Sequence, residues 1–348
     1  MLRDFHSPGR STVYACDGMA ATSHPLASQA AIDVLKAGGT AADAAVAAAA
    51  TLAVVEPHMT GIGGDCFCLV AKPGTPIWGY NGSGRAAAAA RADILWDQGV
   101  RTIDPDSPHG VTVPGAIEAW SAVLQSHGRF GLDRAFAPAI RYAEHGFPVA
   151  PRVAYDWTFS EQALRADPGA SRHFLVNGRA PAVGDIMRFP ALAGTLKSIA
   201  ARGPKAFYEE AAAEIVATLA TRGSWLTRED FANHHGEQVT PVSSNYRGLD
   251  VVELPPNGQG LVALVLLNIL ENFDLASLDP HGPERLHIAL EAARMAFAVR
   301  DTHVADPAFM RVSAPSLIDR GFIYRGSDFR ASYEVLALAN IKKDLEGC

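Results

Sequence analysis

An alanine-rich run at residues 41–55 limits the possible folds of this chain more than any other segment. Thr40 stands immediately before the run and Asp43 three residues later, a spacing that predicts a capping box at the start of a helix. Pro57 prevents this helix from continuing far beyond Val55. Alanine side chains are small enough for a neighbouring helix or sheet to approach closely. We therefore expect a central helix that is buried on most sides.

Helical and extended patterns alternate on both sides of this run. Apolar residues between positions 26 and 35 recur at helical spacing, and Gly38-Gly39 follows as a stop. Two short strands are predicted at 66–72 and 75–82, on either side of a Pro73-Gly74 turn. Further segments predict helices at 115–128, 189–203, 207–223, 261–273 and 283–303, a broken helix or helix pair at 132–146, and a strand at 244–256. Helices therefore outnumber strands, and neither a repeat nor a low-complexity linker separates domains.

The composition narrows the classes of partner. The 348 residues are 48% hydrophobic, enough for one large domain or two ordinary ones. The formal net charge of -7 at pH 7 argues against a nucleic acid or an anionic membrane as partner. No apolar run has the length of a signal peptide or a membrane span, so we expect a cytoplasmic protein.

Cysteine usage is consistent with a reducing compartment. The chain has four scattered cysteines, Cys16, Cys66, Cys68 and Cys348, too few for a disulfide framework. In a strand, Cys66 and Cys68 point to one face, where packing is a simpler interpretation than metal binding. We expect neither a metal nor a cofactor.

Two glycine-rich segments predict turns. "TGIGGD" at 60–65 follows a helix and precedes a strand, the reverse of the order in dinucleotide-binding folds, so a tight turn with close backbone packing is favoured over phosphate binding. "PPNGQG" at 255–260 follows a strand and precedes a helix. Its backbone N–H groups could hold an anion or a substrate carbonyl, and a simple turn before a helix is the alternative.

"YNGSGRAAAAA" at 80–90 places one arginine after a Gly-Ser-Gly loop. Arg85 is either part of a surface turn or part of an anion site, because a guanidinium offers a planar fork of donors matched to carboxylate or phosphate. No serine stands in a nucleophile elbow, and no histidine is paired with a nucleophile by spacing. His24, before Pro25, is interpreted as a turn residue rather than a base. The residues alone give only a weak signal for catalysis.

Longer segments resemble one enzyme family. The stretch from residue 18 to 70 is similar to the amino-terminal signature of the gamma-glutamyltranspeptidase family, and the resemblance extends over about residues 8 to 320. It continues through "TVPGAIEAW", "PAIRYAEHGFPV", "FYEEAAAEI", "LTREDFANH", "YRGLDVVELPPNGQGLVALVLLNILENFDL" and "HIALEAARMAFAVRDTHVADPAF". We therefore expect one family region at 1–320 and a tail at 321–348 that does not clearly match.

The resemblance implies an α+β fold of the N-terminal-nucleophile hydrolase type, an αββα sandwich of two sheets between helical layers. In that family a precursor cuts itself just before a threonine, and the freed threonine attacks a gamma-glutamyl amide with its own α-amino group as base. After Thr302 this chain has no threonine, and Cys348 has its amine tied in a peptide bond. The chain thus resembles the large-chain part only, without a catalytic residue of its own, and it is expected to be inactive until a small chain completes it as a heterodimer.

The loop around Arg85 departs from the typical family pattern of an aspartate, one residue, an arginine and a glutamate. Alignment without gaps puts Asn81 at the aspartate, Ser83 at the arginine and Gly84 at the glutamate, with Arg85 two residues late. "NGSGR" and "PPNGQG" resemble instead the branch that includes cephalosporin-type acylases. We expect Asn81, Gly82, Ser83, Gly84 and Arg85 to bind the acyl group of the substrate, with a carboxylate met in a shifted position and glutathione turnover weakened.

The resemblance thus implies an enzyme that cleaves or transfers gamma-glutamyl or related acyl groups, such as glutaryl, from small amides through an acyl-enzyme. A catalytically inactive truncated remnant or scaffold of the same fold is the alternative. If the large chain is made alone, it is expected to aggregate through exposed sheet edges and apolar surface.

Overall fold

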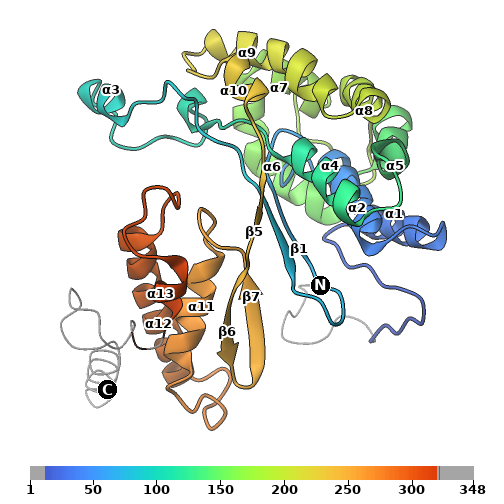
Figure 1. Cartoon of the computed structure of the whole chain (residues 1–348). Helices are drawn as coiled ribbons and strands as arrows, with labels where there is room; N and C mark the ends of the chain where they lie inside the picture. Colours follow the sequence, from blue (N-terminus) through green and yellow to red (C-terminus); the bar gives the residue numbers. More distant parts are fainter. Residues whose placement is uncertain (1–11, 320, 322–348) are drawn as a thin grey trace. The chain divides into compact units, whose positions relative to one another are not determined.

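The computed structural model describes residues 12–319 and residue 321 of the chain. Internal contacts divide these residues into two compact units (Figure 1). The first unit comprises the described residues up to Cys66 together with Gly82–Gly236, and the second comprises Phe67–Asn81 and the described residues from Glu237 onward. The tail predicted at 321–348 lies outside the described residues, apart from Gly321.

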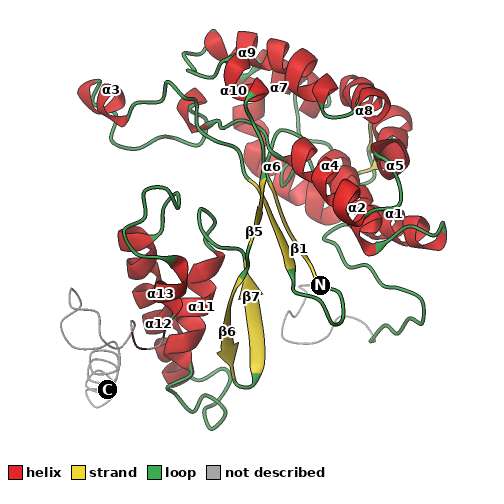
Figure 2. Ribbon diagram, in the orientation of Figure 1, coloured by secondary structure: helices red, strands yellow, loops and turns green. Residues whose placement is uncertain are grey.

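The first unit is predominantly helical (Figure 2). Its helices are α1 (Pro25–Lys36), α2 (Ala41–Val55), α3 (Ala92–Asp97), η1 (Pro108–Gly110), α4 (Ala116–His127), α5 (Leu132–His145), α6 (Pro151–Ala166), α7 (Pro168–Phe174), α8 (Pro190–Arg202), η2 (Ala206–Ala211), α9 (Ala212–Ala220) and α10 (Arg228–Ala232). Two short strands, β3 (Phe147–Pro148) and β4 (Ile186–Met187), pair antiparallel.

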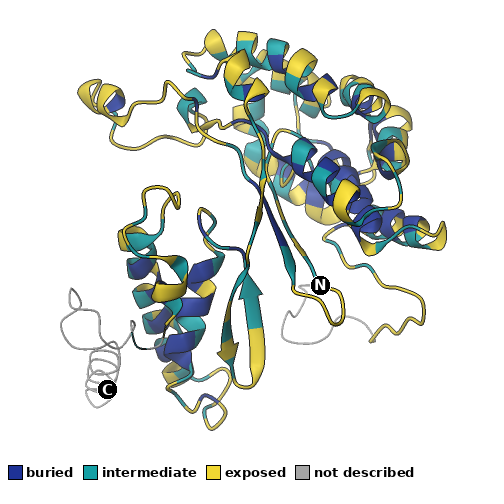
Figure 3. Ribbon diagram, viewed as in Figure 1, coloured by how far each residue is buried: buried dark blue, intermediate teal, exposed yellow. Residues whose placement is uncertain are grey.

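The alanine-rich run forms α2, as predicted. The Thr40 hydroxyl accepts a hydrogen bond from the Asp43 N–H, and the Asp43 carboxylate accepts one from the Thr40 N–H, which is the expected capping box. Helix α2 packs against α1, α4 and α5, and eleven of its fifteen residues are buried (Figure 3). The small side chains thus allow α2 to serve as the central helix of the first unit.

The predicted break at 132–146 is not observed. Helix α5 is continuous from Leu132 to His145, with Pro138 inside it. A proline within a helix removes one backbone hydrogen bond and costs about 3 kcal/mol. Packing of α5 against both α2 and α8 outweighs this local preference.

The second unit combines strands and helices. It contains β1 (Cys66–Val70), β2 (Trp78–Gly82), β5 (Glu237–Val239), β6 (Val242–Tyr246), β7 (Leu249–Glu253), α11 (Gly260–Leu270), α12 (Pro283–His303) and α13 (Ala314–Ile318). Strands β1, β2 and β5 form a three-stranded sheet in that order, and β2 pairs antiparallel with β5. The predicted turn between β1 and β2 is confirmed, with Gly74 at φ +76.

The strand predicted at 244–256 is instead part of a hairpin. Strands β6 and β7 pair antiparallel from Val242 opposite Glu253 to Tyr246 opposite Leu249. Arg247 and Gly248 both have positive φ, 53° and 85°, as a two-residue hairpin turn of type I′ requires. Helix α11 packs on both strands and α12 packs on α11, which buries an apolar core of the second unit.

Candidate functional site

Close backbone packing fixes the loop at residues 82–85. A Cβ built on Gly82 would lie 2.4 Å from the Cβ of Ala119, and one built on Gly84 would lie 1.5 Å from the carbonyl oxygen of Val113. Real Cβ atoms do not approach other atoms so closely, so only glycine fits these two positions. The Val113 N–H donates to the Arg85 carbonyl at 3.0 Å. The loop is therefore held from both of its ends.

The predicted turn at 60–65 supports the same loop. The carbonyl of Gly64 accepts hydrogen bonds from the N–H groups of Gly115 and Ala116, at 3.0 and 2.9 Å, so its backbone lies against the start of α4. The Asp65 carboxylate accepts the Gly84 N–H at 2.9 Å. The prediction of a tight turn with close backbone packing is confirmed, and Asp65 adds a side-chain support that the sequence interpretation missed.

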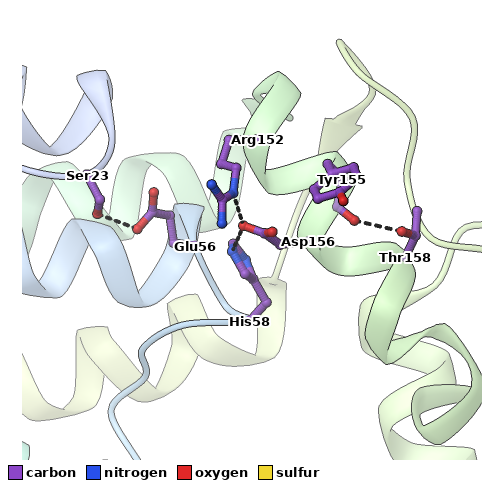
Figure 4. A network of polar contacts seen from close by, with 7 residues as sticks. All are labelled: Ser23, Glu56, His58, Arg152, Tyr155, Asp156 and Thr158. Atoms are coloured by element: carbon purple, nitrogen blue, oxygen red, sulfur yellow. Dashed lines mark hydrogen bonds and ion pairs between the residues drawn. The ribbon is translucent and has the colours of Figure 1, made fainter. Parts of the chain in front are cut away.

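A polar network fixes the end of α2, from which this turn departs (Figure 4). The Ser23 hydroxyl donates to Glu56 at 2.5 Å, so the start of α1 is tied to the end of α2. Arg152 of α6 donates to Asp156 at 2.6 Å, and the His58 Nε2 lies 3.4 Å from the same carboxylate. These contacts hold residues 56–58, which connect the end of α2 to the turn at 60–65.

His24 is a cap of α1. Its side chain is buried, and its Nδ1 accepts the Leu26 N–H at 3.2 Å. Burial lowers the pKa of His24, and the nearby Glu56 only partly opposes this. A neutral capping imidazole agrees with the interpretation of His24 as a turn residue.

The predicted site residues fall in both units. Asn81 is buried in the second unit, where its Nδ2 donates to the Asn257 Oδ1 at 2.7 Å. This hydrogen bond joins "NGSGR" at 81–85 to "PPNGQG" at 255–260, the two segments that depart from the typical family pattern. Gly82 to Arg85 belong to the first unit, where Ser83 and Gly84 are half-buried and Arg85 is exposed.

A groove of 1150 Å³ in the first unit reaches both segments that support the loop. Gly63 and Pro114 line one part of it, next in sequence to the hydrogen-bonded residues 64 and 115. Helices α6, α7 and α9 supply most of the remaining wall. Its volume is ample for a small-molecule substrate, since ligand pockets commonly measure about 300–1,000 Å³.

A histidine that the sequence interpretation did not single out lies behind the loop. The His234 ring stacks on Tyr208, with ring centroids 5.5 Å apart. The Tyr208 hydroxyl donates to the Pro114 carbonyl at 2.8 Å and accepts the Glu118 N–H at 3.2 Å. His234 is the last residue of the family-like segment "LTREDFANH", but its contacts could not be predicted from the sequence, because Tyr208, Gly115 and Glu118 come from other parts of the chain.

The described residues contain neither a metal-binding cluster nor a membrane-spanning helix. No cluster of three or more histidine, cysteine or acidic side chains in residues 12–319 has the geometry to hold a metal ion. Within the same residues, no helix is both long and apolar enough to cross a membrane.

Comparison with known proteins agrees with the sequence resemblance. The family model for gamma-glutamyltranspeptidase matches residues 27–327. A glutathione hydrolase-like YwrD proenzyme of Bacillus subtilis is 40% identical over 309 residues, 87% of this chain and 58% of its own length. An oxamate amidohydrolase proenzyme of Klebsiella pneumoniae is 38% identical over 321 residues, 90% of this chain and 59% of its own.

Solved structures give the same result. The cephalosporin acylase of Bacillus halodurans superposes with a TM-score of 0.84 at 40% identity, over 92% of this chain and 61% of the acylase. This chain therefore spans less than two thirds of the length of these three relatives. The expected α+β fold of the N-terminal-nucleophile hydrolase type is confirmed. The chain belongs to the gamma-glutamyltranspeptidase family.

Proposed function

We propose that this chain forms the acyl-binding part of an amide hydrolase or transferase that acts on gamma-glutamyl or related carboxylate-bearing acyl groups, such as glutaryl. The observation that carries the proposal is the rigidly held loop 82–85, which presents Arg85 at its end. A guanidinium on a fixed backbone suits recognition of a carboxylate, because the backbone of the loop need not be ordered when the substrate binds.

The loop has the properties of a binding element rather than a flexible surface turn. Its backbone is tied to Asp65 and Val113, and its glycines press on neighbouring backbone. We place the amine side of an amide substrate in the groove of the first unit, whose lining includes Gly63 and Pro114 of the supporting segments. The relatives are a glutathione hydrolase-like protein, an oxamate amidohydrolase and a cephalosporin acylase. Glutathione, oxamate and cephalosporins each combine an amide with a carboxylate.

The nucleophile of this proposed reaction comes from outside residues 1–348, from a small chain made by processing as in the proenzyme relatives. A threonine hydroxyl adds to the amide carbonyl, the carbon–nitrogen bond breaks, and the amine leaves with a proton. Water or an acceptor amine then resolves the ester acyl-enzyme. Without that segment the chain is inactive in this proposal.

The proposal is tested by completing the chain with a family small chain and measuring hydrolysis of gamma-glutamyl-anilide and glutaryl-anilide. Arg85→Ala should raise KM for the glutaryl substrate, because it removes a charged hydrogen bond worth about 1.5–3 kcal/mol. A loss of about 1.4 kcal/mol is a tenfold change, so the expected increase is roughly 10- to 100-fold.

Two controls separate this effect from general damage. Arg179→Ala removes another exposed arginine of the first unit and should leave KM unchanged. Acetyl-anilide lacks the acyl carboxylate, so its hydrolysis should not respond to Arg85→Ala. Equal KM values for wild type and Arg85→Ala on both carboxylate substrates would remove Arg85 from the site. A completed protein without any amidase activity would favour the scaffold alternative.

A further inference from the structure

His234 has an unusual position for a histidine without a hydrogen bond. Both of its ring nitrogens are buried, and neither has a hydrogen-bond partner among the residues that the structure describes. A neutral imidazole carries one donor and one acceptor, and an unpaired buried polar group costs about 1–3 kcal/mol. The unpaired nitrogens make His234 a candidate for a role beyond packing.

The ring lies directly behind the loop 82–85. A Cβ built on Gly115 would lie 2.1 Å from the carbonyl oxygen of Gly82 and 3.3 Å from the His234 Nε2. On its other face the ring stacks on Tyr208, at an interplanar angle of 29°. The imidazole is thus enclosed between Tyr208 and the point where the loop meets the start of α4.

Charged groups from every neighbouring segment act on this ring. Burial lowers the pKa of His234 most strongly, Glu118 of α4 raises it, the adjacent His235 lowers it, Asp65 raises it, and Arg85 lowers it. The Glu118 carboxylate also accepts the Gly236 N–H at 3.1 Å, so it is held near the ring. His234 therefore shares its electrostatic surroundings with the Asp65 that holds the loop and with Arg85.

We propose that His234 is a positioning residue of the acyl-binding loop, and that binding of a substrate carboxylate at Arg85 is coupled to protonation of its imidazole. This rests on the proposed function. Without a bound substrate carboxylate, the positive charge of Arg85 disfavours a second positive charge on His234. A carboxylate on Arg85 offsets that charge, so the imidazole accepts a proton from solvent more readily when substrate is bound.

Thermodynamic linkage makes the coupling reciprocal. If substrate favours the protonated imidazole, then the protonated imidazole favours substrate by the same factor. The affinity for carboxylate-bearing substrates should therefore increase as pH falls through the titration of His234, as long as the substrate carboxylate stays ionised. The affinity for a neutral acyl group should not depend on protonation of His234.

The first experiment does not depend on catalysis. The His234 titration is followed by NMR of the imidazole C–H signals in the completed protein, and the signal is assigned by its loss in His234→Phe. Arg85→Ala should raise the pKa of His234 by removing a nearby positive charge, and Arg179→Ala should leave it in place. An unchanged His234 titration in Arg85→Ala would overturn the inference even if the enzyme is active.

The second experiment measures KM for glutaryl-anilide and acetyl-anilide between pH 5 and 8. In wild type, KM for the glutaryl substrate should fall by about fivefold towards acid pH, at the lower end of typical couplings between two sites, whereas KM for the acetyl substrate stays constant. His234→Phe keeps a ring that stacks on Tyr208 and removes two unpaired nitrogens, so it should fold normally and lose the pH dependence. His145→Phe, at the exposed end of α5, is the control and should keep it.

The two experiments distinguish the possible failures. If Arg85→Ala shifts the His234 titration but KM does not depend on pH, the carboxylate does not bind at Arg85 and the proposed function is wrong in that respect. If His234→Phe retains the full pH dependence of KM, another group carries the proton and the role of His234 is refuted.

Discussion

Replacing Asp43 by alanine should destabilise the first unit more than the loss of an ordinary helix cap. The Asp43 side chain is fully buried and accepts hydrogen bonds from the N–H groups of Thr40, Arg129 and Phe130, at 2.7 Å, 3.0–3.1 Å and 2.9 Å. The Thr40 hydroxyl donates to it as well, at 2.9 Å. One carboxylate therefore starts α2 and also fixes the chain between α4 and α5.

The expected magnitude follows from the groups left behind. Alanine removes the acceptor of three backbone N–H groups, and each buried unpaired donor costs about 1–3 kcal/mol. Arg129 is exposed, so its N–H can recover part of this cost by binding water. We expect a loss of about 3–5 kcal/mol in the free energy of unfolding, within the range of severe point substitutions.

The assay is urea denaturation of wild type and Asp43→Ala, followed by circular dichroism. Asp230→Ala is the comparison, because Asp230 forms the same capping box with Thr227 at the start of α10 but is only partly buried and accepts just one further backbone N–H, from Ala88 at 2.8 Å. Loss of an ordinary cap costs about 0.5–2 kcal/mol. If Asp43→Ala costs no more than Asp230→Ala, the argument from three shared donors is refuted.

The effect should also depend on pH. Burial alone would raise the pKa of Asp43, but hydrogen bonds from Thr40, Arg129 and Phe130 outweigh it, so the pKa lies below its ordinary value. A depressed pKa in the folded state means that the ionised carboxylate stabilises the fold above the unfolded pKa, about 3.9. This stabilisation is lost as pH falls through the folded pKa. The difference between wild type and Asp43→Ala should therefore be full at pH 7 and shrink below about pH 4.

Two further predictions concern the loops. Gly84→Ala forces a Cβ against a backbone carbonyl, so it should lower the free energy of unfolding by about 2–4 kcal/mol in thermal unfolding. Gly194→Ala is the control, because a Cβ at Gly194 has open space within helix α8. This substitution should be neutral or stabilise the protein by up to about 1 kcal/mol. Asn257→Ala removes the side chain that accepts a hydrogen bond from the buried amide of Asn81, so it should lower the free energy of unfolding by about 1–2 kcal/mol. A double-mutant cycle with Asn81→Ala measures the coupling between the two side chains. A coupling energy of zero would contradict this contact.

Local sequence signals predicted much of the fold. The capping box of α2 depends on residues three positions apart, and α12 matches the predicted helix from residue 283 to 303. The β6–β7 hairpin was missed because its turn is Arg247-Gly248 rather than the usual Asn-Gly or Asp-Gly. Helix α6 was not predicted, since only three of its residues are buried and the apolar pattern is correspondingly weak.

Less of the candidate site than of the fold could be predicted from the sequence. The family resemblance indicated the loop 81–85, but not which residues hold it. The contact between Asp65 and Gly84 joins residues 19 apart, and the position of His234 behind the loop depends on the fold of the whole first unit. Local sequence patterns cannot predict contacts between residues so far apart in the chain. A location in the cytoplasm and a small partner chain stay predictions.

The support of the loop gives a physical reason why a carboxylate anchor can stand at position 85 rather than 83. Ser83 is half-buried between Gly82 and Gly84, which lie against Ala119 and Val113. Arg85 has an exposed side chain, but its carbonyl is fixed by the Val113 N–H. A fixed backbone with an adaptable guanidinium can meet a carboxylate that lies two residues further along the loop. In our proposal, an anchor at position 85 favours acyl groups that differ from gamma-glutamyl in shape but keep the terminal carboxylate. Glutaryl amides therefore test the site more directly than gamma-glutamyl amides do.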